Sequence, residues 1–187
     1  MTDDGFRRVG DRAVWDGRRI RVAIAEVDAP DGSRLEREIV HHPGAVGVVP
    51  LHDDGTVTLV RQYRAALDAE IWEVPAGLRD VDGEPTVETA RRELVEEAGL
   101  RAGAIEYVLT FHNSPGFSDE AVEVFVATSL TSVADDRQGV EEQHMTIDRV
   151  PLAEARAMVD DGRITDAKTV IALLAIALRQ SRAAPPG

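Results

Sequence analysis

The sequence predicts an α/β fold in which a mixed sheet is sandwiched between helices, with an antiparallel β extension at the N-terminus. Three observations lead to this fold class. Strand-like segments precede and follow one amphipathic helix, two further helices come late in the chain, and turn residues separate strand-like segments near the N-terminus. The 187 residues suffice for one domain with a real core and a short extension.

The N-terminal extension is predicted from strand residues broken by turns. Val14–Val40 reads as strand material that is interrupted at Asp16–Gly17 and again at Pro30–Ser33. Val22–Val27 and Leu35–Val40 flank the second turn, and this order is typical of an antiparallel hairpin. We therefore predict a β-hairpin extension over residues 1–42, a main domain over 43–180 and a disordered tail over 181–187.

The central helix is predicted from Pro85 to Ala98, because proline suits the first turn and Gly99 suits the left-handed position after the last turn. His52–Gly55 is a second hairpin signal, and Thr131–Glu142 is polar and acidic and reads as a long loop. The remaining predicted elements are strands at Ala45–Pro50, Val57–Gln62, Ile71–Val74, Ile105–Thr110, Val122–Thr128 and Met145–Val150, and helices at Leu152–Asp161 and Asp166–Arg179.

Composition excludes several classes of partner. The chain has 21 basic and 34 acidic residues, and its formal charge of −13 repels nucleic acid and anionic membranes. It has no cysteine, which rules out disulfides and thiolate nucleophiles, and it has no apolar stretch long enough to cross a membrane. We expect a soluble, cytoplasmic protein that binds neither nucleic acid nor membrane, although metal ions and arginines could still attract a small phosphorylated substrate.

Three glutamates share one face of the central helix. Glu93, Glu96 and Glu97 stand at i, i+3 and i+4, so their carboxylates are neighbours and repel one another. A hard divalent cation such as Mg²⁺ is what oxygen ligands in this arrangement attract. Taken alone, the pattern is more often a solvated acidic face. The surrounding residues change that balance.

A motif extends over the loop and the helix that carry these glutamates. Its positions are Gly77, Glu84, Arg92, Glu93, Leu94, Glu96, Glu97, Gly99 and Leu100, which resemble the Nudix box G-x5-E-x7-R-E-U-x-E-E-x-G-U, with U aliphatic. A chance match is on the order of one in 10⁹ per start site. One departure lies before the helix, where six residues separate Gly77 from Glu84 instead of the five in the family pattern. An extra residue in a loop leaves the glutamate spacing intact.

Segments outside the box resemble the ADP-ribose pyrophosphatase branch of this family. They are Arg61–Arg64, Trp72–Gly77 and Ser114–Glu120. The resemblance implies hydrolysis of the pyrophosphate bond of ADP-ribose to AMP and ribose 5-phosphate, with Arg64 at the diphosphate. The substrate-binding residues that it implies are Arg37, Arg61, Arg64, Glu73, Ser114 and Gly116.

The resemblance also implies a metal site and a general base. The implied metal ligands are Glu93, Glu96, Glu97 and the backbone carbonyl of Ala76, which would hold two or more Mg²⁺ ions, or alternatively Mn²⁺. Glu97 would also count as catalytic, and the base would come from Glu141 or Glu142 in the loop beyond the box. The residues expected to be structural are Gly77, Glu84, Arg92 and Gly99.

Alternatives remain at this point. The box sees only the pyrophosphate and the metal, so another nucleoside-diphosphate sugar or a dinucleotide is a rival substrate. A Nudix module that binds a nucleotide without cutting it is a second rival, against which the intact glutamates argue. The resemblance further implies a homodimer in which the N-terminal extension exchanges between subunits, with Ile20 and Arg37 near the adenine of the substrate.

Overall fold

The chain forms two compact units. The computed structural model describes residues 5–134 and 144–183. The N-terminal unit contains the chain up to Gly44 together with the segment His112–Ala121. The main unit contains Ala45–Phe111 and the chain from Val122 onward. The segment His112–Ala121 thus belongs with residues that precede it by some seventy positions rather than with its chain neighbours, which a linear division of the sequence does not anticipate.

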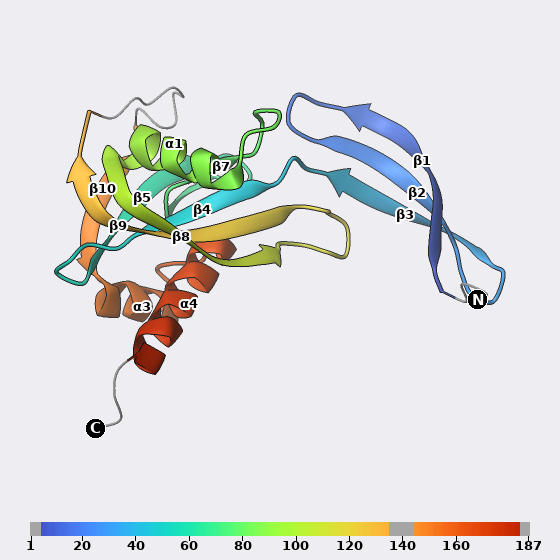
Figure 1. Cartoon of the computed structure of the whole chain (residues 1–187). Helices are drawn as coiled ribbons and strands as arrows, with labels where there is room; N and C mark the ends of the chain where they lie inside the picture. Colours follow the sequence, from blue (N-terminus) through green and yellow to red (C-terminus); the bar gives the residue numbers. More distant parts are fainter. Residues whose placement is uncertain (1–4, 135–143, 184–187) are drawn as a thin grey trace. The chain divides into compact units, whose positions relative to one another are not determined.

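The N-terminal unit is built on a three-stranded antiparallel sheet in the order β1-β2-β3, seen as the blue strands in Figure 1. The strands are β1 (Arg7–Asp16), β2 (Arg21–Asp28) and β3 (Arg34–His41). β2 and β3 form the hairpin that the sequence predicts, whereas most of β1 was not predicted as strand. Its side chains are exposed along the whole strand, so no apolar alternation marks it.

The segment His112–Ala121 is joined to β3 by backbone hydrogen bonds. The Val40 N–H donates to the carbonyl of Phe117 over 2.7 Å, and the Asp119 N–H donates to the carbonyl of Val40 over 3.2 Å. The imidazole Nδ1 of His41 also lies 2.6 Å from Oδ2 of Asp119. These contacts hold the loop against the end of β3.

The main unit contains two sheets. A mixed sheet has the order β7-β4-β9-β8, with β4 parallel to β9 and antiparallel to β7, and an antiparallel sheet has the order β10-β5-β6. The strands are β4 (Ala45–Pro50), β5 (Thr56–Arg64), β6 (Ala69–Glu73), β7 (Ala76–Leu78), β8 (Leu100–His112), β9 (Ala121–Ser132) and β10 (Thr146–Pro151). The predicted strands are present and several are longer than predicted.

The turn at His52–Gly55 does not close a hairpin ladder, which corrects that part of the prediction. The Gly55 N–H donates to the His52 carbonyl, and a single bridge joins Leu51 to Val57. Beyond it β4 and β5 enter different sheets. Both strands are buried on both faces over most of their length, so each finds partners other than its chain neighbour.

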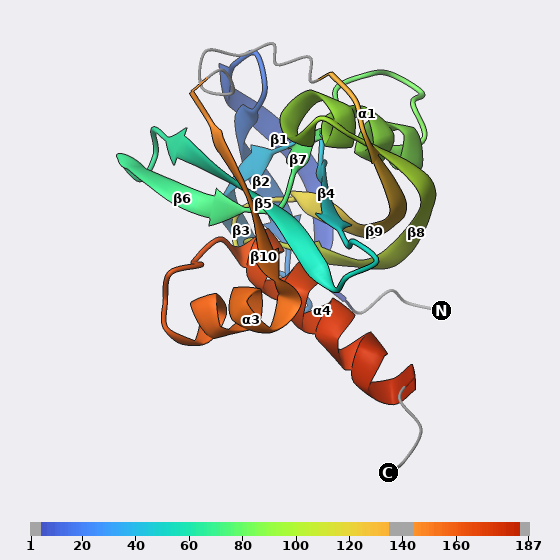
Figure 2. The ribbon, with the colours of Figure 1, turned by 90° about the vertical axis from the view of Figure 1, so that its left-hand side faces the viewer.

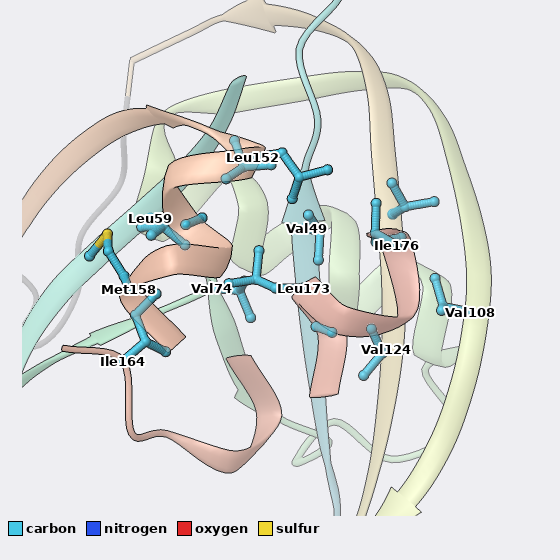
Figure 3. Close-up of a cluster of buried hydrophobic side chains, with 14 residues drawn as sticks. Val49, Leu59, Val74, Val108, Val124, Leu152, Met158, Ile164, Leu173 and Ile176 are labelled. Atoms are coloured by element: carbon cyan, nitrogen blue, oxygen red, sulfur yellow. The ribbon is translucent and has the colours of Figure 1, made fainter. Parts of the chain in front are cut away.

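Helices cover both faces of the mixed sheet, as Figure 2 shows. They are α1 (Thr86–Ala98), α3 (Leu152–Asp160) and α4 (Ala167–Ala183). The two-residue period of the strands divides the core between them. On β4, Val46 and Val48 face α1, while Val49 faces α3 and α4. Figure 3 shows Val49 beside Leu173 of α4 and Leu152 of α3.

The end of α4 differs from the prediction. The helix continues to Ala183, so residues 181–183 are helical rather than part of the tail predicted to be disordered, and residues 184–187 lie outside the described part of the chain. Among the described residues, no helix combines the length and the apolar character needed to cross a membrane.

Candidate active site

Helix α1 presents two buried glutamates to the start of strand β7. Pro85 stands at its N-cap, and Gly99 ends it in the left-handed conformation with φ of 61°. Its apolar residues Ala90 and Leu94 pack on the mixed sheet, which fixes the rotation of the helix. Glu93 and Glu97 lie beside that apolar stripe, so they are buried together with it. The two residues are only 7% and 5% exposed.

Glu97 is held by the backbone. Its Oε2 accepts a hydrogen bond from the Ala76 N–H over 2.8 Å. Burial raises the pKa of Glu97 to about 8, and the Glu93 carboxylate adds to this rise, while the Ala76 N–H and the charge of Arg64 oppose it. A carboxyl group with so raised a pKa is one whose charge the protein leaves poorly compensated.

Glu93 fills the space beside Gly77. A methyl group built on Gly77 would lie 2.0 Å from the carboxyl carbon of Glu93, so only glycine lets the carboxylate reach this position. Arg92 Nη1 donates to Oε1 of Glu93 over 2.7 Å. Glu93 and Glu97 therefore approach adjacent residues of one backbone segment, Ala76 and Gly77.

Glu96 and Glu84 lie on either side of Arg92. Nη1 of Arg92 is 3.2 Å from Oε2 of Glu96, and its Nη2 is 3.6 Å from Oε2 of Glu84. Glu84 also accepts a hydrogen bond from Thr89 Oγ1 over 2.7 Å. The ion pair expected between Glu84 and Arg92 is thus present, and it ties the loop to the helix.

The extra residue of the box is absorbed in the loop before α1. The Glu84 N–H donates to the Val81 carbonyl over 3.2 Å, which closes a turn. Gly83 occupies the left-handed region in this turn, with φ of 75°. The insertion leaves the spacing on α1 unchanged, because it lies before the helix begins.

The two buried carboxylates of this site, Glu93 and Glu97, have the chemistry to hold a divalent cation. Within residues 5–134 and 144–183, no group of three or more histidine or acidic side chains converges as a metal centre. Two observations nevertheless favour a cation here. The carboxylates of Glu93 and Glu97 are buried close enough to raise the pKa of Glu97, and both meet the Ala76–Gly77 backbone. Arg92 contacts the carboxylates of both Glu93 and Glu96.

A second charged cluster lies at the ends of β5 and β6. Glu73 is fully buried, and Arg64 donates to both of its carboxylate oxygens, with Nε and Nη2 each at 2.6 Å. Lys168 Nζ also contacts Oε2 of Glu73 and lies 3.0 Å from Oδ1 of Asp166. Burial opposes the ionisation of Glu73, but the hydrogen bonds from Arg64 and the charge of Lys168 hold its pKa below the usual value.

Arg64 connects this cluster to the glutamates of α1. Its hydrogen bond to Glu73 raises the pKa of the guanidinium, and the charges of Glu97 and Asp166 add to the rise. The Arg64 side chain is 40% exposed, so part of it remains accessible to a solute. Arg61 lies elsewhere on β5, with its guanidinium 5.8 Å from the ring centre of Trp72 and 3.4 Å from a carboxylate oxygen of Glu70.

Other residues expected at the site belong to the N-terminal unit or lie outside the described chain. Arg37 is exposed on β3, where Nη1 donates to the carbonyl of Glu36 over 2.8 Å. Ser114 accepts backbone hydrogen bonds from Phe117 and Ser118 in a tight turn. Gly116 lies in the same turn. The two candidates for the general base, Glu141 and Glu142, lie outside the described residues.

Comparison with known proteins settles the family. A family model described as the NUDIX domain matches residues 41–173. The chain belongs to the Nudix family. It is 38% identical over 176 residues to an ADP-ribose pyrophosphatase of Mycobacterium tuberculosis, covering 94% of this chain and 85% of that one. It is 35% identical over 164 residues to a GDP-mannose pyrophosphatase of Cronobacter sakazakii, covering 80% and 85%.

A solved structure agrees with the Nudix fold. The chain superposes on a protein described as an ADP compounds hydrolase with a TM-score of 0.83 and 23% identity, covering 96% of each chain. This Nudix chain is accordingly a pyrophosphohydrolase with the α/β fold of its family, preceded by a three-stranded antiparallel sheet. Divalent cations are general in Nudix enzymes, which agrees with the two carboxylates on α1.

Sequence reasoning missed Lys168 and Asp166. They lie in a predicted helix start without any motif around them, so spacing alone does not reveal them. One signal was present in the sequence, because Lys168 is the single lysine among 21 basic residues of this Nudix chain. Its partner Glu73, which is predicted to bind substrate, is contacted in the structure by Arg64 and Lys168.

Proposed function

We propose that the protein hydrolyses the pyrophosphate bond of ADP-ribose to AMP and ribose 5-phosphate with the help of Mg²⁺, for which Mn²⁺ is the alternative. One observation carries the proposal. Glu93 and Glu97 are buried side by side against the Ala76–Gly77 backbone, with the partly exposed guanidinium of Arg64 close enough to act on Glu97. Carboxylates that would hold a cation beside an arginine that can bind phosphate suit a diphosphate substrate.

Each predicted site residue of the main unit then has a role. Glu93, Glu97 and the Ala76 carbonyl would hold two or more ions, with Glu96 as a further ligand or as a group that orients Glu93 and Glu97 through Arg92. Bound Mg²⁺ would neutralise charge on the diphosphate and lower the pKa of a water molecule. Arg64 binds the diphosphate through the exposed part of its side chain, and Glu73 holds Arg64 in place. Arg61 contributes positive charge on the same strand.

The reaction adds water across the phosphoanhydride, so one proton must leave the attacking water while the other product takes the bridging oxygen. We propose that Glu141 or Glu142, which follow the box in sequence, accepts this proton as the general base. Ser114 and Gly116 are assigned to the terminal ribose. Binding without cleavage is the less favoured function. Burying two carboxylates costs free energy, and a module that only binds a nucleotide does not need them to hold a catalytic cation.

We also propose a homodimer formed through the N-terminal unit. Its sheet leaves large apolar side chains exposed, among them Val14 at 56% and Phe117 at 57%. A cleft of about 280 Å³ opens on this unit, lined by Glu38 and six apolar residues, Val14, Val22, Ile24, Ile39, Val40 and Phe117. Apolar surface of this kind favours association, and Arg37 and Ile20 would then lie near the adenine bound by the other subunit.

Product analysis tests the activity. The purified protein with Mg²⁺ is incubated with ADP-ribose, GDP-mannose, a UDP-sugar, NADH and a diadenosine polyphosphate, and the products are separated by chromatography. We expect AMP and ribose 5-phosphate from ADP-ribose at the highest kcat/KM. A higher kcat/KM for GDP-mannose would assign the enzyme to another nucleoside-diphosphate sugar, and no cleavage of any compound would favour the binding module.

A further inference from the structure

The single lysine of this chain occupies a position that helix stability does not explain. Lys168 lies in the first turn of α4, where the positive end of the helix dipole disfavours a cation. Its side chain is only 12% exposed, although lysine is seldom buried without partners. The explanation must come from the groups that face it.

Two carboxylates face Lys168, and one of them is the anchor of Arg64. Nζ contacts Oε2 of Glu73 and lies 3.0 Å from Oδ1 of Asp166. Oε2 of Glu73 also receives Nη2 of Arg64 at 2.6 Å. A single oxygen of a fully buried carboxylate is therefore shared between two cations.

This sharing sets the charge that an incoming anion meets. Glu73 and Asp166 carry two negative charges, and Arg64 and Lys168 carry two positive ones, so the cluster is neutral as a whole. Without Lys168 the cluster would carry one net negative charge within a chain that is already at −13. Arg64 is the most exposed member of its pair, with 40% of its side chain accessible against 0% for Glu73. The excess negative charge would therefore repel an anion that approaches the exposed side chain of Arg64.

We infer that Lys168 is a positioning residue for substrate binding. It neutralises part of the negative charge of the Glu73 carboxylate. The guanidinium of Arg64 therefore stays oriented, and its positive charge stays available to an anionic diphosphate. The inference deepens the proposed function and rests on it for the role of Arg64. Lys168 does not itself need to touch the substrate.

Asp166 provides the opposing charge and a means of testing it. Its Oδ2 accepts hydrogen bonds from the N–H and the hydroxyl of Thr169 over 2.9 and 2.6 Å, which caps the start of α4. The Thr169 hydroxyl in turn accepts from the Val74 N–H over 2.9 Å. Asparagine caps helices about as well as aspartate, so Asp166→Asn removes charge from beside Lys168 while it keeps the cap.

The first experiment measures KM and kcat for ADP-ribose with saturating Mg²⁺. Lys168→Met should raise KM about tenfold and lower kcat by less than about threefold, since the interaction aids binding of the diphosphate throughout the reaction. Lys168→Arg, which keeps the charge, should restore KM to within about threefold of the wild type. Arg163→Met is the matched control, because it removes one exposed cation before the same helix and should leave KM unchanged.

A double-mutant cycle separates positioning from general stability. In an Arg64→Ala background, Lys168→Met should change KM by less than about twofold, because the residue through which it acts is gone. Asp166→Asn should lower KM by about twofold or more, which is opposite to Lys168→Met and decides the matter even if Lys168→Met fails to fold. A tenfold rise of KM in the Arg64→Ala background, or an unchanged or raised KM for Asp166→Asn, would overturn the inference.

Failure of the proposed function has a different signature. If the wild type cleaves no compound of the substrate panel, the proposed function fails before Lys168 is tested. If the wild type is active and Lys168→Met behaves as Arg163→Met does, the activity stands and the positioning role is wrong.

Discussion

The two units of this chain differ in what they bury. The main unit places charged side chains in its interior, with Glu73, Glu93 and Glu97 all under 10% exposed. In the described part of the N-terminal unit, by contrast, no charged side chain is buried, and Val14 and Phe117 are each more than half exposed. Buried charge costs free energy that is recovered only when a counter-charge or ligand binds, and exposed apolar surface is stabilised only when something covers it. The difference agrees with the proposal that the main unit carries the chemistry and that the N-terminal unit mediates association.

The strongest test of the main unit removes a buried charge. Glu97→Gln and Glu93→Gln should each lower kcat by about 10³-fold or more, because a neutral amide is a much weaker ligand for Mg²⁺ than a carboxylate. The measurement is steady-state hydrolysis of ADP-ribose, with circular dichroism to verify folding. Glu88→Gln is the matched control on the same helix, as Glu88 is 55% exposed, and it should keep near-normal activity. Near-normal activity in either buried variant would place the metal site elsewhere.

The proposed general base gives the next largest effect. Replacement of Glu141 or Glu142 by glutamine should lower kcat by about 10²–10⁴-fold with little change in KM, as expected when a proton acceptor is lost. Measuring both single variants decides which residue acts. If the double variant also keeps the wild-type rate, the proton acceptor is another group.

A charge placed in the apolar cleft tests the N-terminal unit. Val14→Asp should weaken self-association by about tenfold or more, because an ionised carboxylate in a covered apolar surface is desolvated without a partner. Light scattering over a range of protein concentrations measures the change, and kcat/KM should fall in parallel if the second subunit completes the adenine site. Ala13→Asp is the control, since Ala13 is exposed but does not line the cleft.

Removal of residues 1–40 extends this test, and it should abolish association and activity together although every residue of the box remains. A wild-type protein that is fully active as a monomer at micromolar concentration would contradict the dimer. It would also mean that the exposed apolar side chains of the N-terminal unit serve another purpose.

The smallest expected effect is a pH dependence of stability without metal. The pKa of Glu97 is raised from 4.5 to about 8, so between these values the folded chain binds more protons than the unfolded one. Stability should therefore fall as pH rises through this window. In EDTA, Tm should drop between pH 5 and pH 8 by on the order of 5 °C more in the wild type than in Glu97→Gln. Equal drops would show that Glu97 ionises without cost.

Much of the main unit could be predicted from sequence because its signals are local. The spacing of Glu93 and Glu97 beside an apolar stripe places both on one side of a helix, and Gly99 ends that helix as predicted. The burial of both glutamates follows from the same stripe. The helix period thus predicted which carboxylates share a face, and Arg92 contacts Glu96 at the expected i, i+4 spacing.

The features that were missed depend on contacts between distant residues. Nothing in the sequence near residue 52 shows that β4 and β5 separate into two sheets, since both read as strands across a turn. β1 has no apolar alternation because it is exposed along its length. Lys168 reaches Glu73 across 95 positions of the chain, so its role could be found only from the fold.

The pairing of β4 with β9 has a consequence for how the chain reaches its native state. Ala45 pairs in parallel with Val122, and every residue between them, including all of α1, must be synthesised before that ladder can form. Until then Val46 and Val48 lack β9, one of the two strands beside β4, and α1 lacks Phe125 and Ala127, which contribute to the core on its face of the sheet. Strand pairing over so long a sequence separation is slow. An apolar strand that stays unpaired during this time is prone to aggregate. Translation speed and chaperone supply should therefore govern the yield of this protein more strongly than the stability of its finished fold.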